Sequence, residues 1–95
     1  MSILSDDQVL TLLAAVPGWQ RNGNTIMRTY KLESFPAALV FVSAVGHMAE
    51  AANHHPDILI QWRSVTLTLS THDAGGITEK DFELARQIDG LPRKQ

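Results

Sequence analysis

The hydrophobic residues near the N-terminus recur at the spacing of an amphipathic helix. The common face of this helix is formed by Val9, Leu12, Leu13 and Val16. The preceding segment, Ser5-Asp6-Asp7-Gln8, has the pattern of a capping box, and Leu4 is placed to pack on Val9 as a hydrophobic staple. Pro17-Gly18 cannot continue a helix and predicts its end.

A β-hairpin is predicted directly after this helix. The pair Asn22-Gly23 is a turn signal, because a tight type I′ turn requires positive φ at both central positions. Strands are therefore expected over residues 19–21 and 25–32.

The hairpin is followed by the most hydrophobic helix of the chain. Ser34 is suited to cap its N-terminus, and Pro36 falls in the first turn, where a missing N–H costs nothing. The helix is expected to run to about residue 52 and is apolar or small on most of its sides. A helix with so little polar surface is normally covered on more than one side. We expect its own sheet to cover one side and a second subunit to cover another.

Two further strands and a third helix complete the pattern. Hydrophobic and polar residues alternate over 58–62 and again over 65–70. The start and stop signals of the third helix are the N-cap Thr78, the staple Ile77 and Phe82, and the terminators Gly90 and Pro92. The order α-β-β-α-β-β-α predicts a single α+β domain over residues 1–95. We expect two layers, a four-stranded antiparallel sheet with helices on one face.

Composition narrows the classes of function. The chain is 44% hydrophobic and 19% charged, with a net charge of −2 and no basic stripe, which argues against a nucleic-acid partner. The absence of cysteine excludes disulfides, zinc–thiolate sites and cysteine nucleophiles. The least charged stretch, residues 35–49, is shorter than the ~20 apolar residues that span a bilayer. Asp6 and Asp7 stand where a signal peptide carries basic residues, so we expect a cytoplasmic protein with no membrane partner.

Histidines are the candidates for proton transfer, because imidazole donates or accepts a proton near neutral pH. His54 and His55 adjoin each other at the end of the second helix, and His72 lies in a glycine-bounded loop after a strand. Glu50 lies four residues before His54 and can share one helix face with it. A purely structural role stays open at this point, since histidines at a helix end complement the helix dipole, and Asp81 is the expected N3 carboxylate of the third helix.

Other chemistries fit these residues less well. Glu50, His54 and His72 could chelate a metal ion, but the two adjacent histidines point in different directions, and Ala51 stands where a paired His-x3-His would need its second histidine. There is no G-x-S-x-G elbow and no phosphate-binding P-loop, and Ser70 is better placed to bind than to attack. General acid–base chemistry with two or three histidines, without metal or cofactor, is the remaining hypothesis.

The spacing of these residues resembles that of a known family. Glu50-x3-His54-His55-Pro56 is followed after five residues by Trp62, after nine more by His72, and after eight more by Asp81. This series, together with the segment Pro17-Gly18-Trp19, resembles the pterin-4a-carbinolamine dehydratases over nearly the whole chain.

The resemblance implies a reaction. These enzymes remove water from 4a-hydroxytetrahydropterin and give quinonoid dihydropterin, which is recycled for aromatic amino-acid hydroxylases, and they need no cofactor. The resemblance further implies a pterin substrate, a functional link to such a hydroxylase, and assembly into a homodimer or homotetramer. Some family members also act as non-enzymatic dimerisation partners of a transcription factor, which is the alternative function.

The resemblance also implies the role of each site residue. His54 and His72 resemble the acid–base pair, and His55 resembles the histidine that holds the pterin and can also protonate it. The segments expected to line the substrate contain Asn53, Ser70, Thr71 and Asp73. Glu50 and Asp81 resemble the carboxylates that orient the histidines, with Asp81 capping the third helix and steering His72. His47 has no implied role in catalysis, and a structural or interface role is expected for it.

Overall fold

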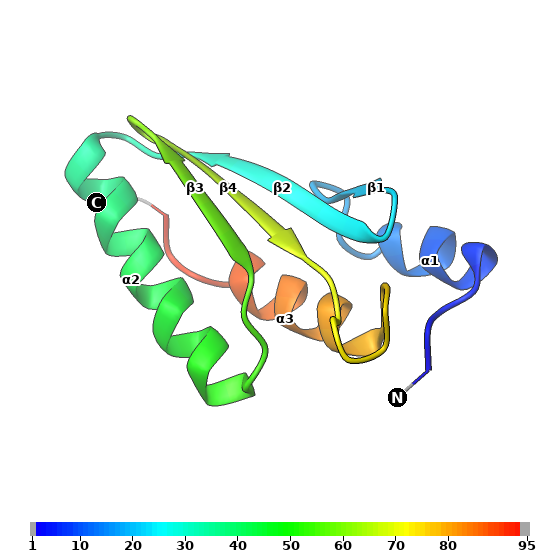
Figure 1. Ribbon diagram of the computed structural model, residues 1–95. Coiled ribbons are helices and arrows are strands. Elements are labelled where there is room, and N and C mark those ends of the chain that lie inside the picture. The colour runs from blue at the N-terminus through cyan, green and yellow to red at the C-terminus, as the bar shows by residue number, and fades with distance from the viewer. Residues whose placement is uncertain (1, 94–95) are drawn as a thin grey trace.

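The computed structural model describes residues 2–93, and within that range its elements follow the predicted order (Figure 1). They are α1 (Asp6–Leu13), β1 (Gln20–Asn22), β2 (Thr25–Lys31), α2 (Phe35–Ala52), β3 (Asp57–Gln61), β4 (Ser64–Leu69) and α3 (Glu79–Asp89). The strands form one antiparallel sheet in the order β1-β2-β4-β3. The predicted α+β class, with a four-stranded antiparallel sheet, is confirmed.

The core lies between the sheet and the helices α2 and α3, which lie on the same side of the sheet in Figure 1. The alternation predicted for β4 is observed, since Val65, Leu67 and Leu69 are buried while the intervening residues are partly exposed. The buried face of α2 consists of Ala37, Ala38, Phe41, Val45 and Ala49. The opposite face of the sheet is open, and there the hydroxyls of Thr29 and Thr66 lie 2.8 Å apart across β2 and β4.

The predicted helix caps are confirmed at all three helices. Ser5 and Gln8 form a capping box at α1, Ser34 accepts a hydrogen bond from the Ala37 N–H at α2, and Thr78 and Asp81 form a capping box at α3. The end of α1 was predicted too late. The helix stops at Leu13, and its last turns tighten into a loop that still buries Val16.

Both hairpin turns differ from the prediction. Asn22 pairs with Thr25, so the central residues of the first turn are Gly23 and Asn24. Only Gly23 has positive φ (62°), which is the sign pattern of a type II′ turn and not of type I′. The second turn contains Trp62, which was expected to end a strand; it has a φ of 56° and is 71% exposed.

The length argument against a membrane-spanning segment was wrong for α2. The helix extends three residues beyond the stretch considered, and its 18 residues with a mean hydropathy of 1.4 suffice for a span by length and composition alone. However, α2 packs against β4 and α3, as the core helix of a globular domain does. Its outer side exposes Phe35, Leu39 and Val40.

Candidate active site

The loop after α2 and the loop after β4 meet around one cavity of about 220 Å³. Its walls are formed by Asn53, His54, His55, Ser70, Thr71, His72, Asp73 and Lys80. The structure therefore brings together every residue that the sequence suggested as catalytic or substrate-binding. A smaller adjoining hollow of about 110 Å³ shares His55, Ser70 and His72 with this cavity.

The backbone at the end of α2 determines where the adjacent histidines point. Asn53 follows the last residue of the helix and has a left-handed conformation, with a φ of 51°. Asparagine tolerates this conformation better than most residues. The chain reverses there, and the N–H of His54 donates to the carbonyl of Ala49 at 3.1 Å. As a result His54 is buried, whereas His55 is exposed.

The buried histidine is paired with a buried carboxylate. His54 Nε2 lies 2.6 Å from Asp81 Oδ1, and the two residues are 8% and 0% exposed. The other oxygen, Asp81 Oδ2, accepts hydrogen bonds from Thr71 Oγ1 and from the backbone N–H of Thr78, each at 2.9 Å. Asp81 was expected to steer His72. It caps α3 as expected, but the histidine that its carboxylate contacts is His54.

The second carboxylate also serves a different histidine from the one expected. Glu50 was predicted to share a helix face with His54, but its Oε1 lies 2.7 Å from Nε2 of His55. The i, i+4 geometry fails because the helix ends at Ala52, before His54. Both side chains of the Glu50–His55 pair are largely exposed, so the pair contributes little to stability.

His72 projects from a tight loop between β4 and α3. Thr71 and Gly76 form an isolated antiparallel bridge, and the N–H of Gly75, whose φ is 81°, donates to the carbonyl of Thr71 at 2.9 Å. Glycine suits that positive φ. Ser70 anchors the start of the loop by donating to the carbonyl of Asn24 at 2.9 Å. His72 itself is exposed at the cavity.

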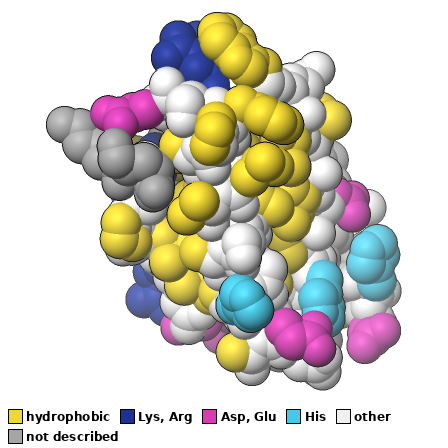
Figure 2. Space-filling view, turned by 90° about the vertical axis from the view of Figure 1, so that its left-hand side faces the viewer, with side chains coloured by type: hydrophobic (Ala, Val, Ile, Leu, Met, Phe, Trp, Pro, Cys, Tyr) yellow, Lys and Arg dark blue, Asp and Glu magenta, His cyan; other side chains and the backbone are white. Residues whose placement is uncertain are grey.

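Histidine and acidic side chains gather toward one end of the face shown in Figure 2, and hydrophobic side chains cover much of the remainder. His47 is exposed on α2 and lines neither the cavity nor the adjoining hollow. Among residues 2–93, no group of three or more His, Asp or Glu side chains is arranged to hold a metal ion.

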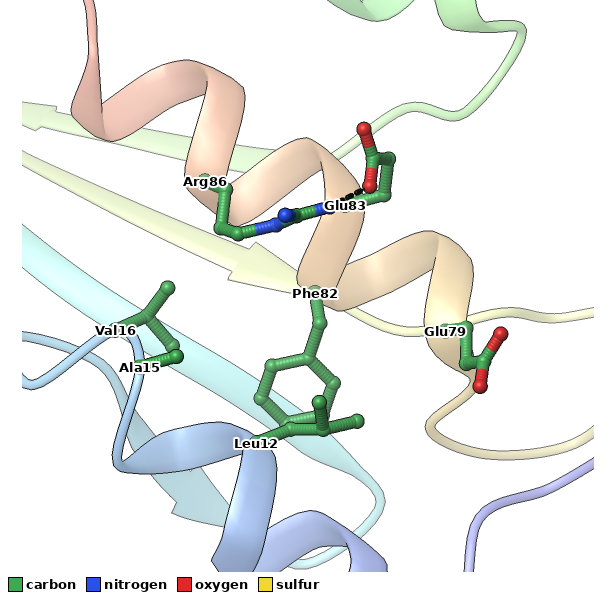
Figure 3. A pocket seen from close by; sticks show the side chains of 7 residues that line it. All are labelled: Leu12, Ala15, Val16, Glu79, Phe82, Glu83 and Arg86. Carbon is green, nitrogen blue, oxygen red and sulfur yellow. Dashed lines mark hydrogen bonds and ion pairs between the residues drawn. The ribbon is translucent and has the colours of Figure 1, made fainter.

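A second cavity, of about 240 Å³, lies between α1 and α3 and has a different character (Figure 3). Leu12 and Phe82 face each other across it, and its charged side chains include Glu83, which is paired with Arg86. It contains no histidine and none of the predicted site residues. Its largely apolar lining, with Glu83 and Arg86 paired to each other, is suited to a packing gap between helices and not to proton transfer.

Comparison with known proteins identifies the family. The family model described as pterin 4 alpha carbinolamine dehydratase matches residues 2–91. The chain belongs to this family. A relative from Nocardia farcinica (strain IFM 10152) is 57% identical over 91 residues, which cover 96% of each chain. A relative from Roseiflexus sp. (strain RS-1) is 58% identical over 88 residues, which cover 93% of this chain and 95% of the relative. Both relatives carry provisional names as pterin-4-alpha-carbinolamine dehydratases. Membership in the family supports a pterin dehydratase activity.

Solved structures of the pterin dehydratase fold agree with this assignment. A transcriptional coactivator/pterin dehydratase from Brucella melitensis has a TM-score of 0.88 at 31% identity and covers 93% of this chain and 96% of its own. A pterin dehydratase-like protein identified as a RuBisCO assembly factor in the alpha-carboxysome has a TM-score of 0.64 at 20% identity, with 81% of this chain and 89% of its own covered. The second likeness shows the fold alone.

Some residues around the candidate cavity were not anticipated from the sequence. Lys80 lines the cavity from the first turn of α3, and its position directly before Asp81 was the only available signal. Asp57 and Thr68 line the adjoining hollow because they are paired between β3 and β4. That pairing is a tertiary feature with no local signal in the chain.

Proposed function

We propose that this protein dehydrates a 4a-hydroxytetrahydropterin to quinonoid dihydropterin and water by histidine acid–base catalysis. The observation that carries the proposal is that His54, held by a buried carboxylate, borders the same cavity as His72. Family membership supplies the substrate class. The cavity is smaller than the ~300–1,000 Å³ of sites for drug-sized ligands, which suits a small bicyclic ring.

The proposed reaction is an elimination that needs only proton transfers. The bond between C4a and its hydroxyl oxygen breaks, and an acid protonates the departing oxygen so that it leaves as water. A base takes the proton from the adjacent ring nitrogen, and that electron pair forms the new carbon–nitrogen double bond. Each positioned acid or base contributes ~10²–10⁴-fold in rate. No electrons are exchanged with another molecule, so the reaction needs no redox cofactor.

In this proposal His54 and His72 are the acid–base pair. His55, paired with Glu50 at the exposed side of the cavity, binds the pterin and can assist protonation. Asn53, Ser70 and Asp73 supply polar groups for the polar edge of the ring. The product would enter tetrahydrobiopterin recycling for an aromatic amino-acid hydroxylase, in the cytoplasm.

The test is a dehydratase assay on the 4a-carbinolamine with single alanine variants. His54→Ala and His72→Ala should each lower kcat by ~10²-fold or more, because each removes a proton-transfer group. His55→Ala should act more on KM. His47→Ala is the matched control, since it removes an exposed histidine that lies outside the cavity. The proposal fails if folded His54→Ala and His72→Ala turn over as fast as the parent, or if His47→Ala alone abolishes turnover.

A second candidate function is a non-enzymatic dimerisation module. It is favoured by the coactivator role named for the Brucella melitensis structure and by the exposed apolar side chains Phe35, Leu39 and Val40 of α2. We propose that these side chains form an interface in a homodimer or homotetramer. A module of this kind has no need for turnover, so absence of dehydratase activity in the folded parent would favour it.

A further inference from the structure

Behind His54, buried hydroxyls join the loop after β4 to the first turn of α3. Thr71 Oγ1 lies 2.7 Å from Thr78 Oγ1 and 2.9 Å from Asp81 Oδ2. Thr71 is 7% exposed, and Thr78 and Asp81 are fully buried. Because each hydroxyl carries one proton, the direction of every hydrogen bond in this set can be determined.

The ionised Asp81 carboxylate has acceptors only, so Thr71 must use its single proton to donate to Oδ2. The contact between the two hydroxyls is then supplied by the proton of Thr78, which donates to Thr71. This leaves Thr78 Oγ1 free to accept the hydrogen bond from the N–H of Lys80, as observed at 3.3 Å. Oδ2 thus accepts from Thr71 Oγ1 and from the Thr78 N–H, and these two donors fix the carboxylate plane.

The same inventory assigns the tautomer of His54. Asp81 Oδ1 can only accept, so the Nε2 atom 2.6 Å away must carry a proton. A neutral imidazole with its proton on Nε2 has its free lone pair on Nδ1. Among residues 2–93, the only buried side-chain nitrogen or oxygen without a partner is Arg63 Nε. His54 Nδ1 also lacks a partner among these residues but is not one of the fully buried atoms, so it keeps some exposure in a side chain that lines the cavity.

We infer that Thr71 and Thr78 are positioning residues: through Asp81 they hold His54 in the Nε2–H tautomer and leave Nδ1 as the atom that exchanges a proton with the pterin. The tautomer follows from the hydrogen bonds alone, and its use in catalysis rests on the proposed function. Thr71 thereby has a different role from the substrate contact expected from the sequence, because its hydroxyl is already engaged on both sides.

The first test is the nitrogen-15 NMR spectrum of His54 in the free parent protein, at a pH where the ring is neutral. We expect a protonated Nε2 and an unprotonated Nδ1. A protonated Nδ1 would overturn the inference whether or not the protein is active. A protein with the expected tautomer but no turnover would refute the proposed function and leave the positioning network standing.

Asp81→Asn sharpens this test. The two donors at the Oδ2 position select the amide oxygen there, so the amide NH₂ faces His54 Nε2 and must donate to it. The tautomer should therefore invert to Nδ1–H, and kcat should fall on the order of 10⁴-fold, as for a triad histidine forced into the wrong tautomer. Retention of the Nε2–H tautomer in the folded variant would show that Thr71 and Thr78 do not fix the orientation of residue 81.

Thr71→Val removes one of the two donors and keeps the shape of the side chain. We expect a smaller share of the Nε2–H tautomer and a kcat lowered on the order of 10-fold, with KM unchanged. Thr71→Ser should restore both values. Thr66→Val is the matched control, because it removes a hydroxyl from the threonine pair on the open face of the sheet. A change in KM alone would make Thr71 a substrate ligand instead. If Thr71→Val does not fold, the spectra of the parent and of Asp81→Asn still show whether His54 holds the Nε2–H tautomer and whether residue 81 keeps its orientation.

Discussion

Replacing Asp81 with alanine should affect both the stability of the fold and the candidate site, because a single carboxylate serves both. The change removes the acceptor of three donors, namely His54 Nε2, Thr71 Oγ1 and the Thr78 N–H. A lost N-terminal cap costs about 0.5–2 kcal/mol, and a buried donor left unsatisfied costs about 1–3 kcal/mol. These losses overlap, so we expect a total near 3–5 kcal/mol, the range for breaking a buried pair. In a domain of this size each kcal/mol lowers Tm by about 4–8 °C, so Tm should fall by at least about 12 °C.

Asp89→Ala provides the control for stability without the site. Asp89 ends α3 on the side away from the cavity, and its Oδ1 accepts from Trp19 Nε1 at 3.0 Å, from Arg28 at 2.9 Å and from the Tyr30 hydroxyl. Its removal also strands several donors, so Tm should fall, but the cavity walls stay intact. Thermal unfolding by circular dichroism gives both Tm values, and kcat is measured well below both midpoints.

The two variants should separate in turnover and not in stability. We expect Asp81→Ala to lower kcat by about 10²-fold or more, because His54 loses its orientation, and Asp89→Ala to keep the parent kcat. If folded Asp81→Ala turned over as fast as Asp89→Ala, the carboxylate would serve only as a helix cap. A Tm equal to that of the parent would refute the assignment of its hydrogen bonds.

Three further outcomes are expected. Activity should survive exhaustive EDTA treatment, because residues 2–93 hold no cluster of three metal-binding side chains; loss of activity that zinc restores would contradict this. Sedimentation at micromolar concentration should give a mass above 10.5 kDa, since Phe35, Leu39 and Val40 expose apolar surface, and a monomer mass would exclude the assembly. Burial and the hydrogen bond to Asp89 raise the pKa of Tyr30, so its stabilising contribution is complete below pH ~10 and is lost as the pH rises further. Denaturant titrations should therefore show an alkaline decline that Tyr30→Phe reduces; an unchanged decline would contradict this origin.

The features that the sequence predicted well are those decided by neighbouring residues. The capping boxes at Ser5 and Thr78 involve atoms three residues apart, and both are observed. The position of the first hairpin turn depends instead on strand register. Asn22, Gly23 and Asn24 are all turn-forming residues, so composition does not select which two are central. The structure selects Gly23 and Asn24 by pairing Arg21 with Ile26 and Asn22 with Thr25. The strand also begins at Gln20, one residue later than predicted.

The candidate site shows the same contrast between which residues belong to it and which of them contact one another. The family spacing indicated which residues surround the cavity, but sequence proximity misassigned both carboxylates. Asp81 lies much nearer to His72 than to His54 along the chain, yet it contacts His54. The left-handed Asn53 ends the helix before His54, and the His54 ring is buried. Glu50 therefore contacts His55 instead of His54. One backbone conformation therefore makes the two adjacent histidines chemically unequal. His54 has a buried carboxylate held by two further donors, whereas His55 has an exposed one that solvent screens, so a fixed tautomer is expected only at His54.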